Sequence, residues 1–479
     1  MENGFQRERE ERKKMEGTVK NCPFRTNYHI MPPVGWLNDP NGLCQFGGVF
    51  HVYFQYSPLN VHGGGGYWGH CTSRDLFHWT YEEPALTTDI PEDRSGVYSG
   101  SALIEDGRMY LFYTGNVKLP GDYDYVDAGR ISTQLMVESG DGFHMSEKRK
   151  ILGMEDYPEH MTEHVRDPKV WKENGRYYLV LGARARAWDS EGKRRDKGGV
   201  LIYVSDNKKD WSLCREIVPE KAFGYMWECP DIFVLDGKRV LSFCPQGLER
   251  EKERFQNLYQ SGYSLMDKGK SLEETFTEWD MGFDFYAPQT FEAEDGRRIL
   301  IAWAGVPDTE QTHRNLSVKN GWQHCLTFPG ELTFQDGRIF RRPARELENL
   351  GWQKAELENG RYDWAGKTVR LTAEGIGEDG WTARIGDGEN ALTVRVMGDR
   401  TELSFLDENG NPAKCGGGRG VRVGRTKGKT EQIQILIDSS IAEIYVNGGE
   451  IVFTTRIYLE KEERGLKVSG EGNCRLEVI

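Results

Sequence analysis

Residues 47–56 have the sequence Gly-Gly-Val-Phe-His-Val-Tyr-Phe-Gln-Tyr, a glycine turn followed by an apolar strand. From Gly48 onward, this order of turn and strand occurs five times along the chain. The five starts lie about 59 to 68 residues apart, and self-similarity at a regular period is typical of propellers and repeat arrays. We therefore predict five repeats, with these strands at residues 48–56, 107–115, 175–183, 237–244 and 296–305.

A polar motif stands about seven to ten residues before each of these turns. The five motifs are Asn38-Asp39-Pro40, Ser99-Gly100-Ser101, Arg166-Asp167-Pro168, Glu228-Cys229-Pro230 and Ala287-Pro288-Gln289. In a propeller, equivalent positions of successive blades meet at one central channel, so Asp39, Asp167 and Glu228 are expected to be neighbours. Converging carboxylates beside tryptophans are what glycoside hydrolysis needs.

Composition narrows the classes of partner. The 479 residues exceed one ordinary core, so two domains are expected. The formal net charge of −13 argues against nucleic acid or an anionic membrane as a partner and favours a small substrate.

Nine cysteines without CxxC spacing indicate reduced thiols. No secretory signal and no apolar run of about 18 residues is visible, so a cytoplasmic protein is expected; the sequence does not indicate an oligomeric state.

The repeat divides the chain into three parts. Residues 1–21 form a charged N-terminal extension, and we expect its stretch from Glu2 to Lys14 to be a solvated disordered tail rather than a short helix; Met15 is an alternative start. Residues 22–343 hold the predicted five-bladed propeller, which carries the catalytic site. Residues 344–479 form a helical connector at 344–349 and a β-sandwich, with strands expected at 368–372, 391–396, 401–406 and 432–437 and a hairpin at 441–446 and 451–458.

Each carboxylate also has an ordinary structural explanation. Asp39 lies among turn-forming residues, and a β-turn explains them without any chemistry. Asp167 follows Arg166, and adjacent opposite charges are commonly a solvated pair. Glu228 follows Tyr225-Met226-Trp227, an apolar setting that suits a general acid or a buried glutamate paired with an arginine. The repeat favours the catalytic interpretation, because it places all three at one channel.

Six ordered motifs resemble the motif set of glycoside hydrolase family 32, which holds invertases, sucrose-6-phosphate hydrolases and fructan hydrolases. They are Trp-Leu-Asn-Asp-Pro-Asn-Gly at 36–42, Gln55, Trp68-Gly69-His70, Tyr98-Ser99-Gly100-Ser101-Ala102, Arg166-Asp167-Pro168 and Glu228-Cys229. The resemblance runs from about Asn27 to the C-terminus. It implies an all-β fold with a five-bladed β-propeller followed by a C-terminal β-sandwich, in agreement with the repeat.

The resemblance also implies residue roles. Asp39 corresponds to the nucleophile, Glu228 to the general acid/base and Asp167 to the stabiliser of the transition state, kept ionised by Arg166. Hydrolysis is then expected to retain configuration through a covalent fructosyl-enzyme, with nucleophile and acid/base about 5 to 5.5 Å apart. Because carboxylates do this work, no metal and no cofactor is expected. The residues that match the fructose subsite are Trp36, Asn38, Gln55, Trp68, Tyr98, Ser99, Arg166 and Trp303.

Within the family, the chain resembles bacterial enzymes of the sucrose-6-phosphate hydrolase type, which makes sucrose-6-phosphate or sucrose the expected substrate. Three alternatives stay open: hydrolysis of short inulin-type fructo-oligosaccharides, admitted by the glycine run at 63–66; an inverting arabinan-type glycosidase; and a non-catalytic sugar-binding propeller. A phosphate subsite needs cations at the channel mouth. The candidates are Lys118, Arg184, Arg186, His313, Arg314 and Lys319.

Overall fold

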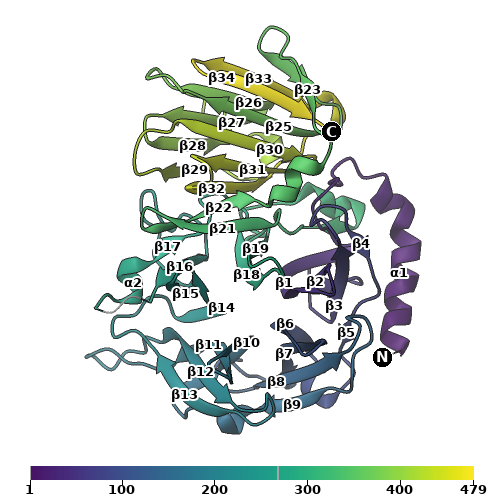
Figure 1. Ribbon diagram of the computed structural model, residues 1–479, viewed down its shortest axis with the longest axis vertical. Helices are drawn as coiled ribbons and strands as arrows, with labels where there is room; N and C mark the ends of the chain where they lie inside the picture. Colours follow the sequence, from purple (N-terminus) through teal and green to yellow (C-terminus); the bar gives the residue numbers. More distant parts are fainter. Residues whose placement is uncertain (1, 267–268) are drawn as a thin grey trace.

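The computed structural model describes residues 2–266 and 269–479, and it has two parts (Figure 1). Five β-sheets surround an axis in the lower part of the view, and two six-stranded sheets lie above them. The predicted all-β fold, a five-bladed β-propeller followed by a C-terminal β-sandwich, is confirmed. Among the described residues, no helix combines the length and apolarity needed to cross a membrane.

Each blade is an antiparallel sheet whose strands follow one another in the chain, apart from β20. Blade 1 contains β1 (Gly35–Phe46), β2 (Val49–Ser57), β3 (Tyr67–Ser73), β4 (Thr80–Tyr81), β5 (Leu86–Thr87) and β20 (Trp322–Gln323). Blade 2 contains β6 (Gly96–Glu105), β7 (Arg108–Lys118), β8 (Arg130–Ser139) and β9 (Arg149–Leu152). Blade 3 contains β10 (Met161–Glu173), β11 (Arg176–Ala185), β12 (Lys197–Ser205) and β13 (Ser212–Ile217). Blade 4 contains β14 (Met226–Leu235), β15 (Lys238–Gln246), β16 (Gly262–Leu265) and β17 (Thr277–Glu278). Blade 5 contains β18 (Tyr286–Glu292), β19 (Arg298–Trp303), β21 (Gly330–Gln335) and β22 (Arg338–Pro343).

The five strands predicted from the glycine turns are the second strands of the blades: β2, β7, β11, β15 and β19. The polar motifs lie on the first strands, which touch one another in a ring around the axis. β20 closes this ring, because it comes from the chain after β19 and pairs in parallel with β1, with Gly35 opposite Trp322.

Each first strand has a β-bulge at its motif. The register shifts fall between Leu37 and Pro40 in β1, and between Val97 and Gly100 in β6. They recur between Arg166 and Lys169 in β10, Glu228 and Asp231 in β14, and Tyr286 and Gln289 in β18. In every case two residues oppose a single residue of the second strand, which re-aims the side chains there. The same local irregularity therefore directs five motifs at one axis.

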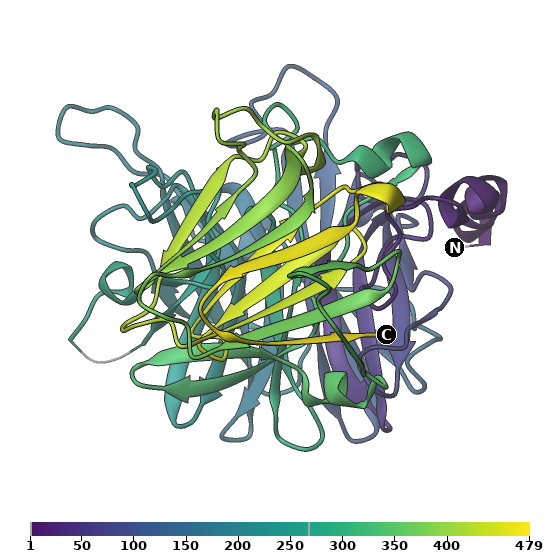
Figure 2. The same cartoon turned by 90° about the horizontal axis from the view of Figure 1, so that it is seen from above.

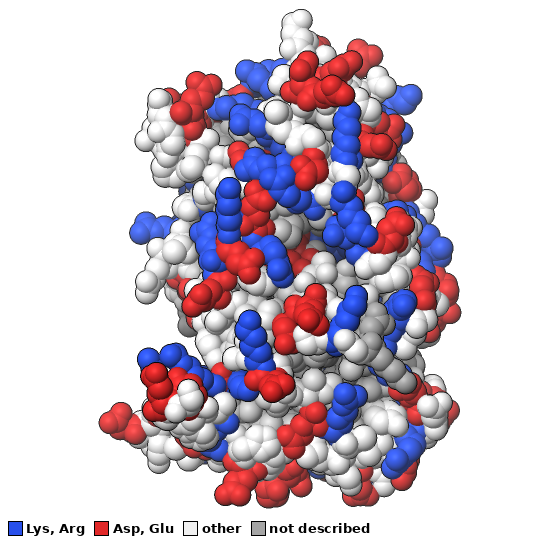
Figure 3. Space-filling model, turned by 90° about the vertical axis from the view of Figure 1, so that its left-hand side faces the viewer, with Lys and Arg blue, Asp and Glu red and all other residues white. Residues whose placement is uncertain are grey.

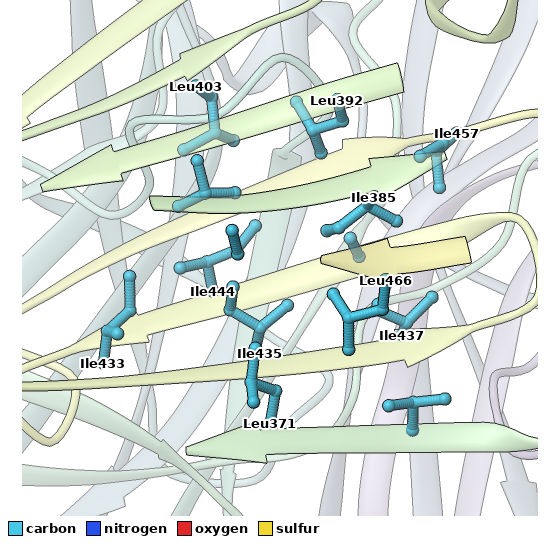
Figure 4. Packing of buried hydrophobic residues seen from close by; sticks show 14 of the residues in the cluster. Leu371, Ile385, Leu392, Leu403, Ile433, Ile435, Ile437, Ile444, Ile457 and Leu466 are labelled. Atoms are coloured by element: carbon cyan, nitrogen blue, oxygen red, sulfur yellow. The ribbon is translucent and has the colours of Figure 1, made fainter. Parts of the chain in front are cut away.

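The sandwich consists of two antiparallel sheets with an apolar interior between them (Figure 4). One has the order β23 (Gln353–Ala355), β34 (Asn473–Val478), β25 (Thr368–Glu374), β30 (Gln432–Asp438), β31 (Ile441–Val446) and β32 (Ile451–Arg456). The other has the order β24 (Arg361–Asp363), β33 (Gly465–Gly470), β26 (Trp381–Asp387), β27 (Asn390–Met397), β28 (Arg400–Ser404) and β29 (Val421–Arg425). The predicted hairpin is β31–β32, and the predicted helical connector is the 3-10 helix at Arg345–Asn349.

The expected disordered tail is instead a helix, α1 (Glu2–Lys20), at the edge of the molecule beside blade 1 (Figure 2). Phe5, Met15 and Val19 pack against the hydrophobic cores. The hydroxyl of Tyr56 donates to Oε1 of the buried Glu8 at 3.2 Å. Composition alone predicts disorder, but these contacts stabilise the helix, since packing supplies most helix stability in proteins.

The face of the molecule shown in Figure 3 carries basic and acidic side chains side by side, over both the propeller and the sandwich. Neighbouring opposite charges are typical of a solvated surface. The carboxylates considered below belong instead to the buried axis of the propeller.

Candidate active site

A cavity of about 540 Å³ is lined by residues of the first four motifs and by Tyr286, which directly precedes the fifth. Ten of the eleven residues that sequence analysis singled out line it: Trp36, Asn38, Asp39, Gln55, Tyr98, Ser99, Arg166, Asp167, Glu228 and Trp303. Trp68 does not line it. The Trp68 indole is fully buried and donates through Nε1 to the carbonyl of Tyr98 at 3.0 Å, so it supports the wall from behind.

Asp39 is held by side chains from two blades. Asn38 Nδ2 donates to its Oδ1 at 3.1 Å, and Ser99 Oγ donates to its Oδ2 at 2.5 Å. Trp36 orients Asn38, because its indole Nε1 donates to Asn38 Oδ1 at 2.7 Å. Burial raises the pKa of Asp39 above its usual range, although the hydrogen bond from Ser99 opposes the shift.

Glu228 is held by more donors than Asp39. Arg166 donates to Oε1 through Nη2 at 2.6 Å and through Nε at 3.2 Å. Gln246 Nε2 and the hydroxyl of Tyr286 each donate to Oε2 at 2.7 Å. Both oxygens are therefore fixed in position. Sequence analysis missed Gln246 and Tyr286, although Tyr286 directly precedes the fifth motif, which was the available signal.

Asp167 departs from expectation. Its Oδ2 lies 3.9 Å from Nε of Arg166 and accepts a hydrogen bond from the backbone N–H of Cys229 at 3.0 Å. Burial raises the pKa of Asp167 to about 7; Arg166 opposes this shift, and the neighbouring carboxylates of Glu228 and Asp39 add to it. Arg166 thus favours the ionised form of Asp167, as expected, but burial outweighs this effect, because the arginine donates its hydrogen bonds to Glu228.

The thiol of Cys229 lies between two of the carboxylates. Its Sγ is 3.8 Å from Oδ2 of Asp39 and 3.7 Å from Oδ2 of Asp167. Burial raises the pKa of Cys229 well above its ordinary value, so the group stays a protonated, weak donor. The neutral thiol thus contacts both Asp39 and Asp167, and burial disfavours the ionised form of each carboxyl group.

His164 stands behind Arg166 and outside the cavity lining. Arginine only donates, so the 2.7 Å contact between Arg166 Nη1 and His164 Nδ1 makes Nδ1 the acceptor. The proton is then on Nε2, which donates to the carbonyl of Tyr125 at 2.9 Å. Burial and the nearby arginines lower the pKa of His164 to about 2. His164 is thus a neutral group that orients Arg166.

The mouth of the cavity has walls of different charge. Lys118 and Arg130 line one part, and Asp308 and Glu310 line another. Of the six cations expected at a phosphate subsite, Lys118 alone lines this cavity. Arg184 pairs with Asp196 and Arg186 with Asp127, each at 2.7 Å, so these two are engaged elsewhere.

The glycine run of residues 63–66 contributes three residues, 63–65, to the cavity lining. A Cβ atom on Gly63 would lie 3.3 Å from the ring of Trp36, and its φ of +91° disfavours other residues. The loop can therefore lie close to the tryptophan only with glycine at this position. Within residues 2–266 and 269–479, no group of three or more His, Cys, Asp or Glu side chains is arranged to hold a metal ion.

Comparison with known proteins agrees with this geometry. Residues 29–343 match the glycosyl hydrolases family 32 N-terminal domain, and residues 387–478 match the family 32 C-terminal domain. The sucrose-6-phosphate hydrolase of Bacillus subtilis (strain 168) is 36% identical, over 98% of this chain and 96% of that protein. The chain belongs to glycoside hydrolase family 32, and the expected enzyme class, a glycosidase, is confirmed.

Two solved structures have the same fold. The sucrose-6-phosphate hydrolase of Lactobacillus gasseri superimposes with a TM-score of 0.83 at 29% identity, covering 98% of this chain and 95% of that one. A mutant of the GH32 beta-fructofuranosidase of Bombyx mori in complex with sucrose has a TM-score of 0.79 at 29% identity, covering 99% and 97%. Sucrose is thus a ligand of one relative that shares the whole architecture.

Proposed function

We propose that this protein is a retaining β-fructofuranosidase that releases fructose from sucrose-6-phosphate or sucrose. The observation that carries the proposal is the meeting of Asp39, Asp167 and Glu228, from three different blades, in one cavity. The names of the Bacillus subtilis and Lactobacillus gasseri relatives support the substrate class. A cytoplasmic location belongs to the same proposal, together with the propeller boundaries at residues 22 and 343.

In this mechanism Glu228 gives its proton to the glycosidic oxygen while Asp39 attacks the anomeric carbon of the fructosyl unit. The leaving sugar departs and a covalent ester joins fructose to Asp39. Water, deprotonated by Glu228, then cleaves the ester, which releases fructose and restores both carboxyl groups. The predicted separation of about 5 to 5.5 Å between the two carboxyl groups suits this retaining course.

Asp167 binds hydroxyl groups of the fructosyl unit, and its ionised form favours the oxocarbenium-like transition state. Trp36 and Trp303, whose ring centroids lie 5.8 Å apart, supply an apolar wall for the sugar ring. Asn38, Gln55, Tyr98, Ser99 and Arg166 complete the fructose subsite, and Trp68 acts through Tyr98.

Short fructo-oligosaccharides are the second candidate substrates, because the glycines at residues 63–65 take little space at the cavity. Comparing kcat/KM on sucrose, sucrose-6-phosphate and 1-kestose separates the two candidates. At least a tenfold preference for the phosphorylated sugar, about 1.4 kcal/mol, supports the first candidate; equal or better rates on 1-kestose support the second.

The catalytic roles are tested with Asp39→Asn and Glu228→Gln, and with Asp206→Asn, an exposed aspartate paired with Arg176, as the matched control. We expect kcat on sucrose to fall by at least about 10³-fold in the first two variants and to stay unchanged in the control. Proton NMR of the first product should show β-fructofuranose. An Asp39→Asn variant as active as the parent contradicts the nucleophile role, a parent inactive on every fructoside points to a non-catalytic propeller, and an α-configured first product points to inversion.

A further inference from the structure

Two cations from adjacent strands share the cavity wall. Lys118 ends β7 and Arg130 begins β8, and the two residues are directly opposite in the antiparallel register. Both line the cavity that contains the three carboxylates. The segment between them is closed at its base, because the backbone N–H of Leu119 donates to the carbonyl of Gly129 at 2.8 Å. The spacing between the two cations is therefore set by the sheet.

Among the described residues, the side chain of neither cation forms an ion pair, although Glu163 Oε2 accepts a hydrogen bond from the backbone N–H of Arg130 at 2.6 Å. Lys118 Nζ lies over the ring of Tyr125, 5.8 Å from its centroid. Arg130 donates to neutral oxygens, through Nε to the Tyr125 carbonyl at 3.2 Å and through Nη1 to Asn116 Oδ1 at 2.8 Å. No described acceptor lies within hydrogen-bond distance of its Nη2. Both residues can thus still donate.

A third potential donor adjoins Lys118. The hydroxyl of Ser95, which also lines the cavity, accepts from the backbone N–H of Lys118 at 3.0 Å. A hydroxyl that accepts one hydrogen bond keeps its own proton available. Ammonium, guanidinium and hydroxyl donors on one wall suit a tetrahedral dianion better than a neutral sugar.

Two carboxylates that line the same cavity influence the orientation of an anionic ligand. Asp308 and Glu310, which follow β19 in the chain, also line the cavity, and the hydroxyl of Tyr259 donates to Asp308 Oδ2 at 3.2 Å. An anionic substituent is repelled by these carboxylates and attracted to Lys118 and Arg130, so the field orients the ligand as well as binding it.

We propose that Lys118 and Arg130, assisted by Ser95, form a subsite for a phosphoryl group carried by the sugar that leaves when fructose is released. This inference rests on the proposed function, since it assigns the outer part of the same cavity. It corrects the candidate set drawn from the sequence: Lys118 is retained, Arg130 is added, and the remaining five cations are left out.

The test compares Lys118→Gln, Arg130→Gln and the conservative Arg130→Lys with the parent, on sucrose and on sucrose-6-phosphate. Lys319→Gln is the matched control, because Lys319 is exposed and lies 3.9 Å from Glu460 outside the cavity. We expect the ratio of kcat/KM on the phosphorylated sugar to that on sucrose to fall at least about tenfold in both glutamine variants. Arg130→Lys should retain part of the preference, and Lys319→Gln all of it.

Binding gives a second readout that does not depend on turnover. Calorimetry with glucose 6-phosphate, glucose and inorganic phosphate should show tighter binding of glucose 6-phosphate than of glucose to the parent, and this difference should be lost in Lys118→Gln. Tight binding of inorganic phosphate alone indicates an unspecific anion site and contradicts the proposal.

A parent that hydrolyses sucrose without any preference for the phosphorylated sugar overturns this inference and leaves the proposed function standing. A parent inactive on every fructoside overturns the proposed function, and the calorimetry still tests the subsite.

Discussion

Arg166 donates two hydrogen bonds to Glu228, which lies in the next blade, and none to Asp167, its neighbour in the chain. The cause is the bulge between Arg166 and Lys169, where Asp167 takes a positive φ of 65°. The change in backbone direction separates the two adjacent side chains. The guanidinium therefore holds the proposed acid/base, and Asp167 stays in a buried site with other carboxylates nearby.

Replacing Arg166 by lysine should disable catalysis without removing the charge. A lysine ammonium cannot reproduce the fork that meets Glu228 Oε1 and His164 together, so the acid/base is no longer fixed. We expect kcat/KM on sucrose to fall about 10²-fold or more, measured by steady-state kinetics. Arg176→Lys, on the surface beside Asp206, should keep full activity; a loss below threefold in Arg166→Lys contradicts the role.

Asp167→Asn should stabilise the protein at neutral and alkaline pH. Burial raises the pKa of Asp167 to about 7 from an ordinary 3.8, so the unfolded chain ionises first as pH rises. Stability therefore falls between about pH 4 and pH 7, and the penalty is complete above that range. Asparagine cannot ionise, and it tolerates a positive φ.

We expect the melting temperature of Asp167→Asn to exceed that of the parent by a few degrees at about pH 8, with the difference vanishing near pH 4. Thermal unfolding at both pH values measures this, with Asp206→Asn as the control. A variant less stable than the parent at the higher pH shows that the ionised carboxylate is favoured in the fold.

His164 should act as a positioning residue. Alanine at this position removes the acceptor for Arg166, and we expect kcat to fall about tenfold with little change in KM. Because the pKa of His164 is lowered to about 2, the pH–rate profile should keep its shape. His164→Gln, which offers both an acceptor and a donor, should recover part of the rate, and His160→Ala, beside Glu216 on the surface, should have no effect.

A buried histidine connects the segment before blade 1 to the sandwich. His29 contacts Asp438 Oδ2 through Nδ1 at 2.8 Å and Glu443 Oε1 through Nε2 at 3.1 Å. Burial opposes the charge, but the hydrogen bonds to Asp438 and Glu443 raise the pKa of His29 above its ordinary 6.5. This contribution to stability is complete below pH 6.5 and is lost as pH rises through the raised pKa.

His29→Gln should lower the free energy of unfolding by about 3–5 kcal/mol at about pH 6, because buried carboxylates lose their cation. Urea unfolding at that pH and at about pH 9 should show the deficit shrinking at the higher value. His144→Gln, next to Asp141 and largely exposed, serves as the control. A deficit that does not change with pH indicates that His29 is neutral in the fold.

Helix α1 should contribute to stability. A chain that starts at Met15 loses the hydrogen bond between Glu8 and Tyr56 and the ion pair between Arg9 and Glu83. We expect the free energy of unfolding to fall by about 1–3 kcal/mol, measured by urea unfolding. Identical midpoints for the two chains contradict the docking of α1.

Much of the fold is predictable because its signals are local. A glycine turn specifies the hairpin of each blade, and the turn at Asn447-Gly448-Gly449 specifies the hairpin β31–β32. The period of the turns sets the number of blades, and the motif at each first strand places Asp39, Asp167 and Glu228 on one axis. Strands without such signals were missed, including β26, β33 and β34 of the sandwich.

The sequence by itself determined the five blades, the sandwich and the set of residues at the axis, since turns and repeats act over a few residues. Only the tertiary structure decided that Arg166 pairs with Glu228, that Arg130 joins Lys118 on the cavity wall, and that residues 2–20 form a docked helix. These outcomes depend on contacts between residues far apart in the chain. Bulge geometry and burial, which no local pattern specifies, determine which partners meet.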